Sequence, residues 1–247
     1  NEVGNGTQNY QTTDWTKADE IGLFGNVYDM AFDTSGNLYI TMSIYNIRVY
    51  KVTPQGDISV FAGVGTYMNN PGANETPEIG KKANEVRFNG LRAIVIDSQD
   101  QMYIAETNTG IIYKVNISTQ EIVGKYPTSR PDGFTVVNMN LDPLGNLYIY
   151  YSNGTNELQK TWYLGKLNVN DSSPTFTAVF AASDLPTADD RYVNMGVDAN
   201  GDLYFLQPNR SKIMKYTTSS QTWTTFAQST TSGAVGDQRD FRGPRDI

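Results

Sequence analysis

Apolar and polar residues alternate in short runs along most of this chain, and Gly, Pro, Asn and Asp interrupt the runs. Residues 94–107 show the pattern most clearly. An apolar run ends at Asp97, a polar turn follows, and a second apolar run covers 101–106. Short alternating runs bounded by turn-forming residues are typical of antiparallel strands. The stretch therefore predicts two strands joined by a tight turn.

The same strand pair returns three more times, and an aspartate marks the end of each first strand. These aspartates are Asp33, Asp97, Asp142 and Asp198. Three of the four units read Asp-x-x-Gly-(Asn/Asp)-Leu-Tyr-(Ile/Phe). The glycine can adopt a positive φ, and the aspartate can accept hydrogen bonds from turn amides. We therefore expect the same tight turn in every unit.

Two further strands follow each pair, so that each unit contains four. In the second unit they are expected at 93–97, 101–106, 111–115 and 120–124. Four-stranded units that recur at about 40–50 residues indicate the blades of a β-propeller. The predicted fold class is all-β, a propeller of four-stranded antiparallel blades. The complete blades are expected at about 26–63, 90–126, 136–180 and 192–227.

Both ends of the sequence bear on how such a ring closes. Residues 241–247 resemble the start of a fifth blade, so a five- or six-bladed ring is expected. Residues 26–247 are assigned to the propeller domain. An open blade edge would expose unpaired backbone groups. Either the N-terminal segment 1–25 completes the last blade, or the natural chain extends beyond Ile247; we favour the longer chain.

Composition excludes several kinds of chemistry. The chain has no cysteine and no histidine, so it has no disulfide, no thiolate or histidine metal site and no Ser-His-Asp triad. A formal charge of −7 argues against nucleic-acid binding, which needs clustered Lys and Arg. No apolar run is long enough to predict a membrane-spanning segment. A Tyr- and Thr-rich composition with only 18% charged residues suggests a secreted, periplasmic or cell-surface protein.

The blade sequence resembles the NHL repeat. That repeat reads Gly-Pro-Arg-Gly-Ile-Ala-Val-Asp, followed by Gly-Asn-Leu-Tyr-Val-Ala-Asp. Here the second blade reads Gly90-Leu91-Arg92-Ala93-Ile94-Val95-Ile96-Asp97 and then Met102-Tyr103-Ile104-Ala105-Glu106, and the chain ends in Gly243-Pro244-Arg245-Asp246-Ile247. The resemblance covers about residues 26–247 and implies a propeller. It says little about function, because this fold is used by scaffolds, receptors, lyases and lactonases.

Polar residues four positions before the anchoring aspartates form one group of candidate site residues. In a propeller these positions line a central channel. Asp29, Asn138 and Asn194 occupy them, with Asp246 at the matching place in the fifth unit. Their oxygens could bind a hard cation such as Ca²⁺. The alternative is that they line a water-filled channel and satisfy backbone groups.

Arginines and loop residues form a second group. Arg92 and Arg245 occupy equivalent blade positions and could bind an anionic ligand, or they bridge neighbouring blades. Tyr67, Met68 and Trp162 are placed in loops or insertions, where aromatic side chains can contact sugar rings or partner proteins. Ordinary loop packing is the alternative. The regularly spaced Tyr39, Tyr103, Tyr148 and Tyr204 are expected in the core.

Two functions are compatible with these patterns. The favoured hypothesis is a non-catalytic binding module for a glycan, peptide or protein partner, which binds on one face near loops 63–89, 127–135 and 181–191. The alternative is a divalent-metal-dependent lactonase, because the sequence around Asp132 resembles the Pro-Asp-Gly signature of gluconolactonase-like propellers. Asp132 lies ten residues before Asp142, however, whereas the lactonase aspartate lies just inside the strand. A structural spacer within a larger surface protein is a third possibility.

Overall fold

The computed structural model describes ten stretches of the chain. These are residues 17–19, 26–43, 47–65, 77–107, 109–128, 134–153, 161–171, 174–181, 194–207 and 212–228. Within them the chain is all-β, apart from a single turn of 3-10 helix, η1 (Ala83–Glu85). No helix in these stretches is long and apolar enough to cross a membrane. The chain divides into two compact units, Asn1–Thr128 and Ser129–Ile247.

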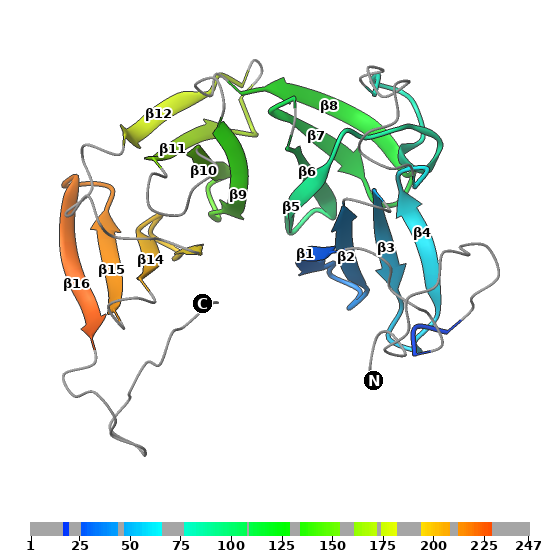
Figure 1. Ribbon diagram of the computed structural model, residues 1–247, viewed down its shortest axis with the longest axis horizontal. Helices are drawn as coiled ribbons and strands as arrows, with labels where there is room; N and C mark the ends of the chain where they lie inside the picture. The colour runs from blue at the N-terminus through cyan, green and yellow to red at the C-terminus, as the bar shows by residue number, and fades with distance from the viewer. Residues whose placement is uncertain are drawn as a thin grey trace. The chain divides into compact units, whose positions relative to one another are not determined.

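The first unit contains two four-stranded antiparallel sheets, here called blades 1 and 2 (Figure 1). Blade 1 consists of β1 (Asn26–Phe32), β2 (Leu38–Ser43), β3 (Arg48–Val52) and β4 (Ile58–Ala62). Blade 2 consists of β5 (Leu91–Ile96), β6 (Gln101–Glu106), β7 (Ile111–Asn116) and β8 (Glu121–Pro127). Strand β8 extends beyond the expected 120–124 because its pairing with β7 continues to Ile111 and Pro127.

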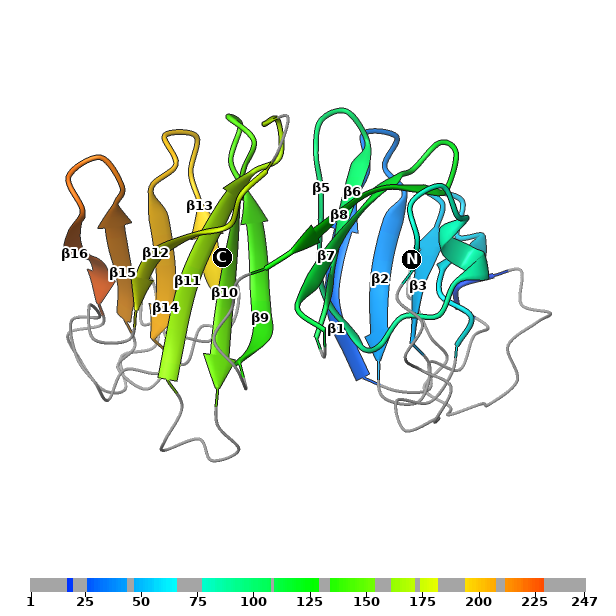
Figure 2. The same cartoon turned by 90° about the horizontal axis from the view of Figure 1, so that it is seen from above.

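The second unit contains blades 3 and 4, whose strands also follow one another in chain order (Figure 2). Blade 3 consists of β9 (Phe134–Leu141), β10 (Asn146–Asn153), β11 (Thr161–Asn168) and β12 (Thr177–Ala181). Blade 4 consists of β13 (Met195–Val197), β14 (Leu203–Gln207), β15 (Lys212–Thr217) and β16 (Thr222–Gln228). The predicted class, all-β with four-stranded antiparallel blades, is confirmed.

The anchoring aspartate holds the turn between the first two strands of every blade. In blade 1, Asp33 Oδ1 accepts hydrogen bonds from the amides of Ser35 and Asn37, at 3.0 and 2.8 Å. Equivalent pairs of amides bond to Asp97, Asp142 and Asp198. The turn glycines, such as Gly36 with a φ of 80°, lie in the left-handed region that glycine adopts without strain.

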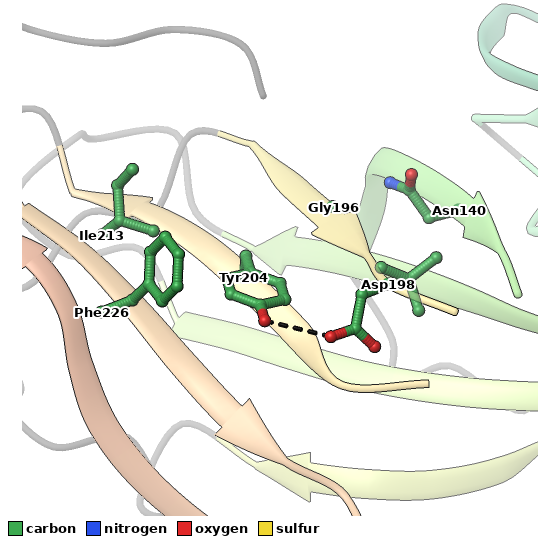
Figure 3. Close-up of a pocket in the computed structure, with 7 residues that line it drawn as sticks. Asn140, Gly196, Asp198, Tyr204, Ile213 and Phe226 are labelled. Carbon is green, nitrogen blue, oxygen red and sulfur yellow. Dashed lines mark hydrogen bonds between the residues drawn. The ribbon is translucent and has the colours of Figure 1, made fainter. Parts of the chain in front are cut away.

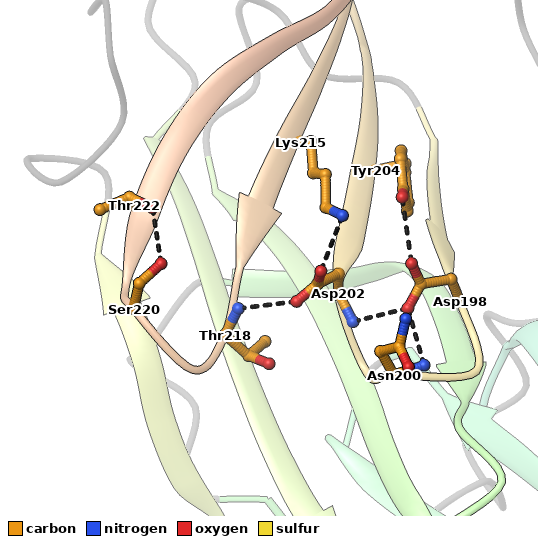
Figure 4. A network of polar contacts seen from close by, with 8 residues as sticks. All are labelled: Asp198, Asn200, Asp202, Tyr204, Lys215, Thr218, Ser220 and Thr222. Atoms are coloured by element: carbon orange, nitrogen blue, oxygen red, sulfur yellow. Dashed lines mark hydrogen bonds and ion pairs between the residues drawn. The ribbon is translucent and has the colours of Figure 1, made fainter.

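The second-strand tyrosine of each blade bonds to the other oxygen of the same aspartate. Tyr39, Tyr103 and Tyr204 donate their hydroxyls to Asp33, Asp97 and Asp198 at 3.1, 3.2 and 3.0 Å, and Tyr148 lies 3.5 Å from Asp142. Figure 4 shows this arrangement in blade 4, where Asp198 bonds to its turn and to Tyr204. The expected core position holds for Tyr39, Tyr103 and Tyr148, which are at most 2% exposed.

The tyrosine-bearing face of a blade packs against the blade that follows it within the unit. In the first unit, Tyr39 and Phe61 of blade 1 share an apolar cluster with Leu91 and Ile94 of blade 2. In the second unit, Tyr148 of blade 3 packs in a cluster with residues of blade 4, among them Phe205. The core is therefore built between blades, from alternate residues of neighbouring sheets.

Removal of one anchoring carboxylate should destabilise the fold strongly. Asp142 is 3% exposed and accepts bonds from the amides of Leu144 and Asn146 and from the Asn146 side chain. Asp142→Ala would leave these donors without their acceptor, so we expect a loss of about 3 kcal/mol in the free energy of unfolding, measured by urea denaturation at neutral pH. The exposed Asp171 provides the control. Asp171→Ala should change the free energy by less than about 0.5 kcal/mol, and equal losses in the two variants would contradict the role given to Asp142.

Candidate functional site

Asp29 and Arg92 lie on the first strands of blades 1 and 2, and both connect the two blades. Asp29 Oδ1 accepts a hydrogen bond from the amide of Met30 at 2.9 Å, and Oδ2 accepts one from the amide of Ile94, in the next blade, at 3.0 Å. The guanidinium carbon of Arg92 lies 4.9 Å from the centre of the Tyr28 ring of blade 1. A cation over an aromatic face is stabilised by the ring quadrupole. These contacts agree with the bridging interpretation of the arginine.

Three asparagines lie close together where blades 3 and 4 meet. Asn140 donates through Nδ2 to Asn138 Oδ1 at 2.6 Å and to the carbonyl oxygen of Met195, in blade 4, at 2.5 Å. Asn194 Oδ1 accepts a hydrogen bond from the amide of Met195 at 2.8 Å. The sequence prediction included Asn138 and Asn194 and missed Asn140. Its position two residues after Asn138 on one strand, and therefore on the same face, was the available signal.

The predicted cation ligands are divided between the two units. Asp29 belongs to the first unit, and Asn138 and Asn194 belong to the second. No cluster of three or more His, Cys, Asp or Glu side chains suited to a metal occurs in the stretches that the structure describes. Asp246 lies outside these stretches, so the Ca²⁺ hypothesis stays a prediction.

The other predicted residues lie mostly outside the described stretches. Arg245, Tyr67, Met68 and Asp132 are in this group. Trp162 was expected in a loop or insertion, but its backbone belongs to strand β11, where it pairs with Ser152. The position of its side chain is outside what the structure describes.

A buried carboxylate, Glu106, fixes the start of blade 2. It is 1% exposed and accepts hydrogen bonds from the amide of Asn89, from the hydroxyl of Thr109 and, at 3.4 Å, from the hydroxyl of Tyr113. Burial raises the pKa of Glu106 above its ordinary value of 4.5, although these three donors act in the opposite direction. Glu106, at the end of β6, therefore links Asn89, which precedes β5, to Tyr113 in the middle of β7.

The raised pKa of Glu106 predicts a pH dependence of stability. When a carboxyl has a higher pKa in the folded chain than in the unfolded chain, its contribution to stability is full at a pH below the pKa of the unfolded chain. This contribution is lost as the pH rises through the pKa of the folded chain. The neutral Glu106→Gln variant lacks this loss. Between pH 4.5 and neutrality, the free energy of unfolding of wild type relative to the variant should therefore fall, as measured by urea titration at each pH. A difference that is flat over this range would contradict the assignment.

A hollow of about 300 Å³ lies on the face of blade 4 that carries Tyr204 (Figure 3). Phe226, Ile213 and Val197 supply its apolar surface. Asn140, Gly196, Asp198 and Tyr204 complete the lining. Burial would raise the pKa of Asp198, but hydrogen bonds from the amides of Asp202 and Asn200 and from the Tyr204 hydroxyl lower it overall. The carboxylate is therefore charged at neutral pH and already bonded to its own turn.

Comparison with solved structures identifies the fold of this chain. No protein-family model and no curated protein matches the sequence. A streptogramin B lyase aligns with 81% of the chain at 14% identity and a TM-score of 0.51, and the chain spans 54% of that protein. The extracellular domain of a hybrid two-component system from B. thetaiotaomicron aligns with 85% of the chain at 12% identity and a TM-score of 0.52, and the chain spans 23% of it. The protein has the β-propeller fold, and identities this low show the fold alone.

Proposed function

We propose that this protein is an NHL-type β-propeller, secreted or on the cell surface, that serves as a non-catalytic binding module for a glycan, peptide or protein partner. The composition supports the location, and the blade signature around Arg92 supports the repeat family. The functional proposal rests on how the polar side chains at the first strands are bonded. The carboxylate of Asp29 is bound to backbone amides, and the asparagines of blades 3 and 4 offer uncharged amide groups.

Asp29 and the anchoring aspartates use their carboxylates mainly to hold the backbone of the blades. Asp29 bonds to two backbone amides, one of them in the next blade. Each anchoring aspartate bonds to its own turn, as Asp33 does. A general acid, a general base or a metal ligand needs lone pairs that substrate or metal can reach. The backbone bonds of these carboxylates support binding over catalysis, because each of the carboxylates already holds part of the fold.

The asparagines near the junction of blades 3 and 4 provide groups suited to recognition. Asn138, Asn140 and Asn194 are partly exposed. An amide side chain offers both donors and an acceptor without a net charge. Such groups suit the hydroxyls of a neutral glycan or the backbone of a peptide. The net charge of −7 also favours neutral or basic partners over nucleic acid.

Binding to a panel of neutral oligosaccharides and to a peptide array tests this function. We expect Asn138→Ala and Asn194→Ala each to weaken binding of any captured probe about tenfold, the effect of one or two lost hydrogen bonds. Asn170 is exposed in the turn after β11, so Asn170→Ala is the matched control and should bind as wild type does. Equal binding by all three variants would show that the amides of Asn138 and Asn194 do not contact the probe.

The lactonase alternative makes a different prediction with the same protein. A metal-dependent lactonase should gain thermal stability with millimolar CaCl₂ and hydrolyse gluconolactone, and Asp29→Asn should reduce both effects. The binding module should show no calcium-dependent turnover. Turnover that needs calcium and Asp29 would overturn the binding proposal in favour of the enzyme.

A further inference from the structure

The aromatic pair on blade 4 has a counterpart on blade 1 with nearly identical geometry and very different exposure. Tyr204 and Phe226 form an edge-to-face pair with ring centres 4.9 Å apart, and Tyr39 and Phe61 form the same kind of pair at 4.9 Å. Phe61 is 1% exposed, whereas Phe226 is 60% exposed. Phenylalanine is among the residues most often buried in folded proteins. The two blades therefore present the same face, covered in blade 1 and open in blade 4.

Blade 2 supplies the cover in the first unit. Phe88, Leu91 and Ile94 pack in one apolar cluster with Tyr39 and Phe61, and each of the three is at most 2% exposed. The backbone of the same segment is also bonded to blade 1, through the Ile94 amide and Asp29 Oδ2. A seven-residue segment that begins at Phe88 therefore closes this face.

The chain contains a second segment with the same apolar spacing. Phe88-Asn89-Gly90-Leu91-Arg92-Ala93-Ile94 and Phe241-Arg242-Gly243-Pro244-Arg245-Asp246-Ile247 carry the same residue at the Phe, Gly, Arg and Ile positions. Two of the three cluster residues are thus identical, and Pro244 replaces the third. Residues 229–240 connect this segment to blade 4 and are similar in length to residues 182–194, which connect blades 3 and 4. A connection of similar length joins the last strand of blade 3 to the first strand of blade 4. Residues 229–240 are therefore long enough to join the last strand of blade 4 to the first strand of a further blade.

We propose that Phe241–Ile247 docks on the open face of blade 4 as the first strand of a further blade. Phe241 and Ile247 fill the hollow beside Phe226 as Phe88 and Ile94 cover Phe61. The hollow is then a junction between blades. Asn140 lines the hollow and also belongs to the asparagines of the proposed function, but Asn138 and Asn194, at which binding is tested, are not part of the lining. The docking proposal can therefore be tested separately from the function.

Coupling between Phe226 and Ile247 tests the docking. We expect Phe226→Ser and Ile247→Ser each to lower the thermal midpoint by about 2–4 °C, and the double variant to lower it no further than the more damaging single change. Leu144, which is 67% exposed in the turn between β9 and β10, supplies the control. Leu144→Ser and Ile247→Ser should have additive effects, because the two sites are independent. Additive effects of Phe226→Ser and Ile247→Ser would overturn the proposal.

A cross-linking experiment gives a second measurement that does not depend on stability. The chain has no cysteine, so Phe226→Cys together with Ile247→Cys creates the only two thiols. A short bis-maleimide should link them within one chain, as read by mass spectrometry. The Leu144→Cys and Ile247→Cys pair should not be linked. Links between two chains would show that a second copy occupies the face, and equal linking of both pairs would show no specific docking; either result would overturn the proposal.

Discussion

The carboxylate of the anchoring aspartate holds two elements that the rest of each blade needs. One oxygen accepts two amides and so fixes the turn after the first strand, and the other accepts the hydroxyl of the tyrosine on the second strand. The tyrosine can enter the core only because its hydroxyl has this partner, since a buried hydroxyl without one is costly. Burial and the charge of Asp142 together raise the pKa of Tyr148 to about 12, so the tyrosine stays a donor at any physiological pH. Turn geometry and core packing therefore depend on one ionised group.

Departures from the repeated unit show how the blades are adapted to their neighbours. Blade 2 has Asp100 where the other turns have glycine, and its φ of 54° is sparsely populated for such a residue. The carboxylate of Asp100 accepts the amide and the hydroxyl of Thr34 in blade 1, at 2.9 and 2.6 Å. These bonds between turns offset the strain of the left-handed backbone. Asp100 therefore joins blade 2 to blade 1, whereas a glycine at this position would have no side chain to do so.

Much of the fold could be predicted because its signals are local. The Asp-to-Tyr spacing, the turn glycines and the alternation of apolar residues all lie within about fifteen residues of one another, so the blade pattern is visible in the sequence. The contacts that determine the role of Asp29 are not local. Its partner is the amide of Ile94, which is 65 positions away, and backbone amides have no signature in the sequence. Asn140 has one contact of each kind, since it donates to Asn138 on its own strand and to a carbonyl in another blade, and only the first was visible as a spacing in the sequence.

Blade 4 lacks the asparagine that bonds to the anchoring aspartate in blade 1, and an ion pair next to the hollow takes its place. Asn37 of blade 1 donates its side-chain amide to Asp33 at 2.7 Å, but the matching residue in blade 4 is Asp202, which has no amide to donate. Two carboxylates so close in sequence would repel, and Lys215 offsets this by an ion pair with Asp202 at 2.7 Å (Figure 4). The Asp202 and Tyr204 hydrogen bonds raise the pKa of Lys215, and its ammonium lies 5.3 Å from the centre of the Tyr204 ring. Tyr204, which lines the hollow, is thus held by Asp198 at its hydroxyl and by Lys215 at its ring, so the substitution of Asn by Asp in this blade leaves the tyrosine in the same place as in blade 1.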